Sequence, residues 1–549
     1  MCSSDLELPA DYKAKVSVEV SPEDKTIKIT DNGLGMTEDE VNEYINQIAF
    51  SGATDFLEKY KDKADSDQII GHFGLGFYSA FMVADKVEII TKKAGENQAW
   101  KWSSDGRNGF EIEESNKDKN GTEITLFLKE EAKDYTDTIY LRHTITTYSD
   151  HINYPIVLDL GEFGEETVNK GSALWAKNKA EITYEQYKDF YQYVSKNFDD
   201  PWMTLHYKAE GSLDYTALLF IPSTQPYDLF QPDKKQGLKL YVNKVFISDK
   251  VEELMPLYLR FVKGIVDSSD LPLNISREML QKNPLIAKIR SATVGRILKE
   301  LKNKSKDYDD YAKFWNNFGI AFKEGIYEDF ANRNEIAELS RFVSTKSKGK
   351  LISLDEYIEC ADKEKKTIYY ITGDDVNTLE NNPQLEIFKN KDIEVLLLTD
   401  PIDEFWTQTL TTYKDFAIKP IAAADFKEIA DRKDEKANEE NLQKLTDFMA
   451  EIFKGEIGKV ELTERLTKSP VSLSVEKGQM SIHLERLMRN HQQQTAFAST
   501  RILEVNPYHR LIIKMSEAVN DDTNKGKIAD VARLLLDQAK IAEGEAVTD

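Results

Sequence analysis

The sequence predicts a multidomain protein in which an α+β first domain precedes α/β and mixed domains. Its 549 residues suffice for about three to four domains. Residues 16–20 alternate apolar and polar side chains as a strand does, and a turn separates them from a second strand at 26–30. Apolar runs at 367–372 and 393–398 flank a helical stretch that ends at Phe388, which is the pattern of a βαβ unit with buried parallel strands.

The first domain is predicted to have one sheet with helices on one face. Thr37 and Glu40 form a capping box that starts a helix. A glycine-rich segment leads into another helix at 77–83, and strands follow at 86–91 and 123–128.

Later segments are less regular. Strands are predicted at 218–221 and 238–247, a long helix at 251–262, and a solvated face or linker at 426–446. The predicted organisation is a first domain at 1–158, a glycine-bearing linker at 159–172, a middle domain at 173–425 and a C-terminal domain at 426–549.

Composition excludes several classes of protein. The net charge of -24, from 96 acidic and 72 basic residues, disfavours contact with nucleic acid or anionic membranes. Two cysteines cannot build a disulfide framework, and no run of about 18 apolar residues could span a membrane. No signal segment is recognisable, so we expect a cytoplasmic protein with no structural metal site.

Two glycine-rich segments predict an adenine-nucleotide pocket. Asp31, at a strand end, can accept a hydrogen bond from the exocyclic amine of adenine, and Thr122 can support it. Gly33 and Gly35 allow the backbone close to the ligand, and Met36 can lie against the base.

The second segment, 71–76, offers free backbone N–H groups to phosphates, and the helix from Phe77 points its positive end towards them. Alone, Asp31-Asn32-Gly33 is typical of a β-turn, and Gly-x-x-Gly-x-Gly is not the dinucleotide fingerprint. Their order, with Gly121-Thr122 following, favours the nucleotide site.

These segments resemble the ATP-binding elements shared by gyrase, the ninety-kilodalton heat-shock chaperones, histidine kinases and MutL (the GHKL type). Residues 48–52, 71–79, 173–178 and 270–281 are similar to the chaperones. The chain is therefore identified as a member of the ninety-kilodalton heat-shock chaperone family, in its bacterial branch.

The resemblance implies a GHKL-type ATP-binding α/β sandwich in a cytoplasmic homodimer that binds and hydrolyses ATP with Mg²⁺ and remodels unfolded client proteins. It implies nucleotide contacts from Asp31, Gly35, Met36, Gly74, Leu75, Gly76, Phe77 and Thr122. Residues 51–68 resemble the ATP lid. Arg277 resembles the arginine that reaches the γ-phosphate, and Gln281 would assist it.

The chain also departs from the family pattern. Members begin with a helix that carries a general-base glutamate and a Mg²⁺-anchoring asparagine, whereas the residues before Asp31 read as strands. We therefore expect an incomplete ATP-binding domain with weak turnover. An ATP-independent holdase is the alternative function, and a DNA-acting GHKL-type ATPase is a more remote one. The chain stops soon after an amphipathic helix at 529–542, which predicts weakened dimerisation.

A client-binding surface is predicted near the C-terminus. Met480, Leu484, Leu487 and Met488 share one helical face, and flexible methionines suit variable apolar partners. Such a stripe is equally typical of a buried core. The resemblance favours an exposed, client-facing helix.

Overall fold

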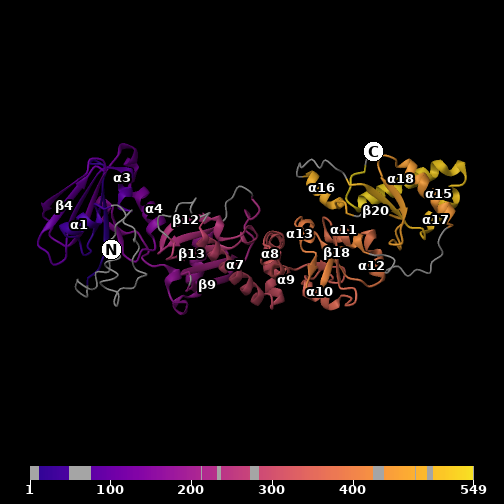
Figure 1. The fold of residues 1–549 in the computed structure, drawn as a ribbon, viewed down its shortest axis with the longest axis horizontal. Coiled ribbons are helices and arrows are strands. Elements are labelled where there is room, and N and C mark those ends of the chain that lie inside the picture. The colour runs from indigo at the N-terminus through magenta and orange to yellow at the C-terminus, as the bar shows by residue number, and fades with distance from the viewer. Residues whose placement is uncertain are drawn as a thin grey trace. The chain divides into compact units, whose positions relative to one another are not determined.

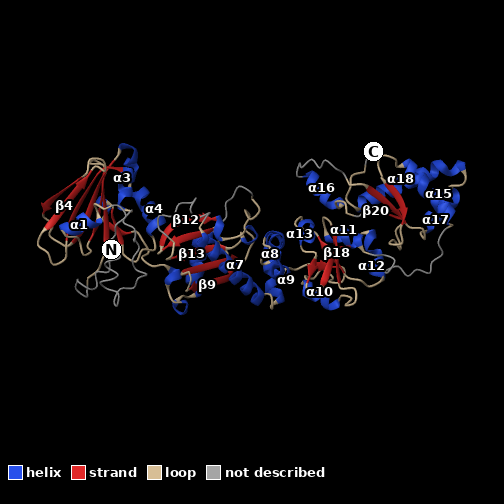
Figure 2. Ribbon diagram, in the orientation of Figure 1, coloured by secondary structure: helices blue, strands red, loops and turns tan. Residues whose placement is uncertain are grey.

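The computed structural model describes residues 12–47, 76–211, 213–231, 237–271, 283–424, 438–476, 478–490 and 499–547. Within these residues the strands form four sheets (Figures 1 and 2). The chain divides into two compact units, Met1–Pro256 with Arg260–Val294 and Leu257–Leu259 with Gly295–Asp549. A multidomain fold of mixed α+β and α/β type is confirmed, while the predicted domain limits stay predictions.

The first sheet has eight strands in the order β5-β4-β3-β6-β2-β1-β7-β8. Its strands are β1 (Val16–Ser21), β2 (Thr26–Asp31), β3 (Ala84–Lys92), β4 (Ala99–Ser104), β5 (Phe110–Ser115), β6 (Gly121–Leu128), β7 (Ile156–Asp159) and β8 (Glu165–Thr167). Strand β1 pairs antiparallel with β2 and parallel with β7, so the seventh strand along the chain lies beside the first.

Short helices pack against this sheet. They are α1 (Glu38–Tyr44), the 3-10 helix η3 (Phe77–Ser79), α3 (Ala80–Val83), the 3-10 helix η4 (Glu130–Thr136) and α4 (Thr138–Ser149). The capping box at the start of α1 is confirmed, because Thr37 and Glu40 each accept a hydrogen bond from the other's backbone N–H. Val41, which is fully buried, joins α1 to the core of the sheet.

The predicted linker at 159–172 is partly structured. It contains the 3-10 helix η5 (Gly161–Phe163) and strand β8, which pairs with β7. Gly161 and Gly164 have φ angles of 64° and 81°, so the glycines that indicated a linker instead form the connection between two paired strands.

The second sheet has the order β12-β11-β13-β10-β9. Its strands are β9 (Pro201–Ala209), β10 (Tyr215–Pro222), β11 (Leu238–Val242), β12 (Val245–Val251) and β13 (Lys263–Ser268). Helix α5 (Tyr184–Ser195) packs on one face, and its Tyr191 is fully buried with Leu218 and Phe220 of β10.

Two expectations in this region are wrong. The predicted strand at 238–247 is a hairpin, because Asn243 and Lys244 take φ angles of 49° and 66° and turn the chain between β11 and β12. The predicted long helix at 251–262 consists of two 3-10 turns, η8 (Glu252–Leu254) and η9 (Leu257–Leu259), followed by β13. Pro256 between the turns lacks the N–H that a continuous helix requires.

The third sheet, in the second unit, has the order β14-β16-β15-β18-β17. Its strands are β14 (Val343–Ser344), β15 (Thr367–Thr372), β16 (Val395–Leu398), β17 (Thr412–Tyr413) and β18 (Phe416–Pro420). The predicted βαβ unit is confirmed, since β15 and β16 are parallel and separated by helical segments. Those segments are α11 (Val376–Glu380), the 3-10 helix η10 (Pro383–Leu385) and α12 (Glu386–Asn390).

Further helices precede or accompany this sheet. They are α7 (Pro284–Lys304), α8 (Tyr308–Glu328), α9 (Arg333–Leu339), α10 (Leu354–Cys360) and α13 (Asp403–Thr409). The long helix α8 buries three phenylalanines, which are Phe314, Phe318 and Phe322.

The fourth sheet, β19-β21-β20, and its helices end the described chain. The elements are α15 (Glu439–Ile452), β19 (Lys459–Leu462), β20 (Val471–Val475), α16 (Ile482–Asn490), β21 (Arg501–Val505), α17 (Arg510–Ala518) and α18 (Lys525–Ala542). Helix α15 replaces the second half of the solvated segment predicted at 426–446, because Leu442 and Leu445 give it a buried face. Helix α18 confirms the amphipathic helix, and of the helices described none is long and apolar enough to cross a bilayer.

Candidate nucleotide site

Asp31 lies at the end of β2, directly opposite Thr122 of β6. Its Oδ1 accepts a hydrogen bond of 2.7 Å from the N–H of Gly33. Burial raises the pKa of the Asp31 carboxyl, and the N–H groups of Gly33 and Thr122 oppose that rise. The sheet therefore holds a partly buried carboxyl acceptor where a strand ends.

Two buried threonines connect this carboxyl to the glycine segment. The hydroxyls of Thr91 and Thr122 lie 3.1 Å apart, and the N–H of Met36 donates to Thr91 Oγ1 over 2.9 Å. Sequence reasoning singled out Thr122 but missed Thr91. Only the register, which sets Thr91 opposite Thr122 across β3 and β6, reveals that the two act together.

Close backbone contacts explain the glycines around the site. A Cβ on Gly35 would lie 1.9 Å from the carbonyl oxygen of Lys92, and a Cβ on Gly121 would lie 2.2 Å from that of Asp31. Both glycines have positive φ angles, 69° and 114°. Gly35 was expected to let the backbone approach a ligand, and that expectation stays a prediction. The close contact that the structure shows at Gly35 is with the backbone of β3.

Asn120 is a second residue that sequence reasoning missed. Its side-chain amide donates to the carbonyl oxygen of Gly33 over 2.7 Å. Together with the hydrogen bond from Ala94 N–H to the carbonyl of Leu34, it fixes the segment that follows Asp31. No spacing rule in the sequence marks this asparagine, because its partner is a backbone atom 87 positions away.

The predicted phosphate segment is described only in part. Gly74 and Leu75 lie outside the described residues, whereas Gly76 precedes η3 with φ of -61°. The Phe77 ring packs edge-on against Trp102, with 5.6 Å between centroids, so the contribution of Phe77 to a ligand would come from its backbone. Tyr78 Oη donates to the carbonyl of Ile45 over 2.6 Å and ties this segment to the end of α1.

Arg277 and Gln281 also lie outside the described residues, as does the segment 51–68 predicted as a lid. Among the residues that are described, no group of three or more histidine, cysteine, aspartate or glutamate side chains is arranged to hold a metal ion.

The predicted client-binding residues lie on and just before α16. Met480, Leu487 and Met488 are half-buried, but Leu484 is buried, so the expectation of a fully exposed face is wrong at that position. Polar contacts also hold this helix. On the neighbouring side chains, His483 Nδ1 lies 3.0 Å from Glu404 Oε1, and Glu485 lies 2.9 Å from the Arg501 guanidinium.

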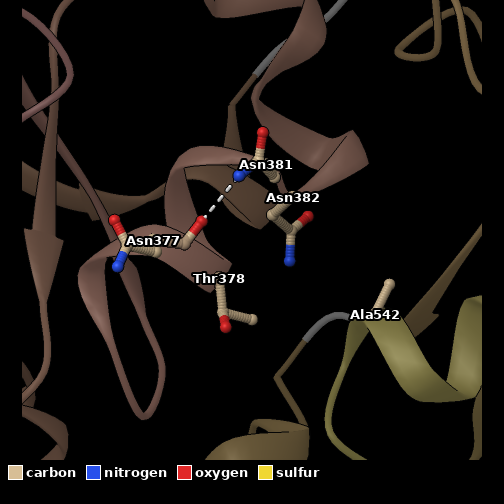
Figure 3. A pocket seen from close by; sticks show the side chains of 5 residues that line it. All are labelled: Asn377, Thr378, Asn381, Asn382 and Ala542. Carbon is tan, nitrogen blue, oxygen red and sulfur yellow. Dashed lines mark hydrogen bonds between the residues drawn. The ribbon is translucent and has the colours of Figure 1, made fainter.

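A separate hollow of about 370 Å³ lies in the second unit (Figure 3). It is lined by Asn377, Thr378, Asn381, Asn382 and Ala542. Two of its amides are already engaged, because Asn381 Nδ2 donates to the carbonyl of Asn377 and Asn382 Nδ2 donates to Glu543. It holds no charged lining group among the described residues and has no part in the nucleotide site.

Comparison with known families gives the class of the first domain. Residues 10–127 match the family described as "Histidine kinase-, DNA gyrase B-, and HSP90-like ATPase". This matched segment contains the site around Asp31. The first domain is therefore a nucleotide-binding ATPase domain of that class.

The match of the remaining chain shows the family to which the whole chain belongs. Residues 161–549 match the family described as "Hsp90 protein". The chain is 47% identical over 553 residues to the "Chaperone protein HtpG" of Paramagnetospirillum magneticum, with 99% of this chain and 88% of the relative covered. It is 44% identical over 558 residues to that of Rhodospirillum rubrum, covering 99% and 88%, and 44% identical over 546 residues to that of Roseobacter denitrificans, covering 97% and 87%. The chain belongs to the Hsp90 protein family and is an ATP-dependent molecular chaperone with ATP hydrolase activity.

Proposed function

We propose that ATP binds in the first domain with its base on Asp31 and its phosphates near Gly76. The observation that carries this proposal is the Asp31 carboxyl, fixed by Gly33 and opposite a pair of buried threonines. A carboxyl at this position accepts from the exocyclic amine, and Thr122 supports it directly or through a water. The proposed contacts are Asp31, Gly35, Met36, Gly74, Leu75, Gly76, Phe77 and Thr122.

The negative charge of the phosphates requires hydrogen-bond donors and positively charged groups around it. Backbone N–H groups of residues 74–77 would bind the phosphates, and Arg277, assisted by Gln281, would stabilise charge on the transferring group. Mg²⁺ commonly binds nucleotide sites through phosphate oxygens and water, with only one or two carboxylates. We propose that Mg²⁺ enters this site with the nucleotide and is held mainly by phosphate oxygens and water.

The proposal extends to partners. Unfolded or partly folded proteins are the proposed clients, and Met480, Leu484, Leu487 and Met488 the proposed contact residues. Since Leu484 is buried, α16 would have to shift before all four side chains meet a client. A homodimer in the cytoplasm is the proposed working form.

Calorimetric titration of the full chain with Mg-ATP tests the nucleotide site. We expect Asp31→Asn to abolish measurable binding, because an amide presents a donor as well as an acceptor to the exocyclic amine. Asp85→Asn is the matched control, since Asp85 is an exposed carboxylate in β3 of the same sheet. Equal affinity in the wild-type and Asp31→Asn proteins would refute the role of Asp31.

A further inference from the structure

A second cavity is lined by residues of the second sheet and its connecting segments. Its volume is about 760 Å³, within the range of roughly 300–1,000 Å³ typical of small-molecule sites. Its lining includes Lys177, Lys179 and Lys244, together with Trp175 and Asp267. None of these residues belongs to the nucleotide site.

One carboxylate brings the lysine-bearing loops together. Asp267 Oδ2 accepts from Trp175 Nε1 over 2.7 Å, and both carboxylate oxygens lie 3.2 Å from the backbone nitrogen of Lys244, which donates to them. Trp175 is in the loop that carries Lys177 and Lys179, whereas Lys244 is in the β11–β12 turn. Asp267 therefore holds two separate segments at one cavity, of which the first supplies two ammonium groups and the second supplies one.

Four lysines and two carboxylates, Asp214 and Asp267, are among the described residues that line this cavity, so positive charge is in excess. Among the described residues no carboxylate lies within ion-pair distance of the ammonium group of Lys177, Lys179 or Lys244. A fourth lining lysine, Lys208, is paired with Glu210 at 3.1 Å. A local surplus of cations stands out in a chain with a net charge of -24.

The kind of charge indicates the ligand. Lysine ammonium groups bind phosphate as point charges, and three of them at one cavity match the nearly two negative charges of a phosphate better than the single charge of a carboxylate. Asn178 and Thr216 add neutral hydrogen-bonding groups. We propose that this cavity binds a small phosphorylated anion, with its phosphate held by Lys177, Lys179 and Lys244.

The test uses the full-length chain and inorganic pyrophosphate as the probe. Lysine acetylation footprinting read by mass spectrometry reports each ammonium group separately. We expect pyrophosphate to protect Lys177, Lys179 and Lys244 from acetylation and to leave Lys188, which is paired with Asp200 at 2.8 Å, unprotected. Protection of all lysines alike, or of none in the cavity, would overturn the proposal.

Variants separate binding from folding. Lys177→Gln and Lys244→Gly should each weaken pyrophosphate binding at least tenfold in calorimetry. Glycine is well tolerated at the φ of 66° that Lys244 adopts, so this variant keeps the turn. Lys348→Gly is its matched control, because Lys348 is an exposed lysine with φ of 53° in the second unit. Equal weakening by Lys348→Gly would overturn the proposal.

Two sources of phosphate are distinguished in the Asp31→Asn background. If ADP protects the same lysines there, the ligand is a nucleotide, and if only pyrophosphate does, it is an inorganic phosphate; both results support the site. Protection by a polyglutamate peptide without protection by either phosphate compound would overturn it. The proposal is independent of the nucleotide site, so its failure leaves that site unaffected.

Discussion

At the scale of single residues, the geometry of the proposed nucleotide site depends on two glycines that have no side chain. Gly35 and Gly121 are positions where a single added carbon would overlap a carbonyl oxygen. The neighbouring carboxyl of Asp31 is fixed by Gly33, so a backbone shift at either glycine would also move the acceptor.

Gly35→Ala should destabilise the first domain by about 3 kcal/mol or more, since strain at φ of 69° adds to the overlap with Lys92. Gly95→Ala is the control, because its φ is 84° but nothing lies within 4 Å of a Cβ there. We expect that variant to cost only about 1 kcal/mol. Urea denaturation of both variants measures the difference, and equal costs would contradict this account.

Asp31→Asn should leave the melting temperature at pH 7 unchanged or raised. The folded-state pKa of Asp31 is raised mainly by burial, so ionisation opposes folding once the pH exceeds the unfolded value of 3.8. The amide removes this cost. Calorimetric scans should therefore show the advantage of the variant at pH 7 and its disappearance as the pH falls below that value. A lower melting temperature at pH 7 would argue against burial as the main cause.

The sequence predicted part of this site because its chemistry is local. Asp31, Gly33, Gly35 and Met36 are close in the chain, so spacing alone groups them. Thr91 could not be found in this way, because its role depends on a register set by two strands that pair across 31 positions.

At the scale of elements, polar contacts hold together segments whose pairing the periodicity of the sequence does not predict. Glu386 at the start of α12 accepts from the N–H groups of Thr467 and Lys468, each over 2.6 Å, and from that of Ser469 over 3.0 Å. Burial alone would raise the pKa of this carboxyl, but the three N–H groups and the Ser469 hydroxyl lower it. The Glu386 side chain therefore holds the loop at residues 467–469 in place, although no strand among the described residues pairs with that loop.

Glu386→Ala should destabilise the second unit by about 3 kcal/mol, because three backbone donors lose their acceptor. The stabilisation by Glu386 exists above its unfolded pKa of 4.5 and is lost as the pH falls through the lower folded value. Denaturation at pH 7 and at pH 3 measures both effects. Glu359→Ala, at an exposed position of α10, should change neither the stability at pH 7 nor its dependence on pH. An equal loss of stability in that variant would contradict the proposed role of Glu386.

Helical periodicity identified α18 and the helix at 38–44 correctly, yet it placed a helix at 251–262 where the chain makes two short turns. Apolar residues at helical spacing indicate only which side chains are buried. They do not distinguish a helix from successive turns around a proline such as Pro256.

At the scale of the whole molecule, two compact units imply separable stabilities. In the second unit, Lys323 of α8 is almost fully buried and donates to Asp403 over 2.7 Å and 3.0 Å. It also pairs with Asp400 at 2.6 Å. This single ammonium group lies between two carboxylates, of which Asp403 is fully buried and Asp400 is partly exposed, and it weakens their mutual repulsion.

Lys323→Met should cost about 3–5 kcal/mol, because it leaves buried charge unpaired. Differential scanning calorimetry of this variant should show a lower unfolding temperature for the second unit and an unchanged one for the first. For Gly35→Ala, the unfolding temperature of the first unit should be lowered and that of the second unchanged. Lys313→Met, an exposed position on the same helix, is the control. A common shift of both transitions would mean that the units unfold together.

Strand β1 lies between β2 and β7, and Val16 faces Ile156. During synthesis the first of these partners leaves the ribosome almost at once, whereas the second is translated on the order of 10 s later, given elongation at roughly 5–20 residues per second. For that interval one edge of β1 offers unpaired backbone groups to any extended chain nearby. A protein that assists the folding of others thus has its own vulnerable period while it is being made.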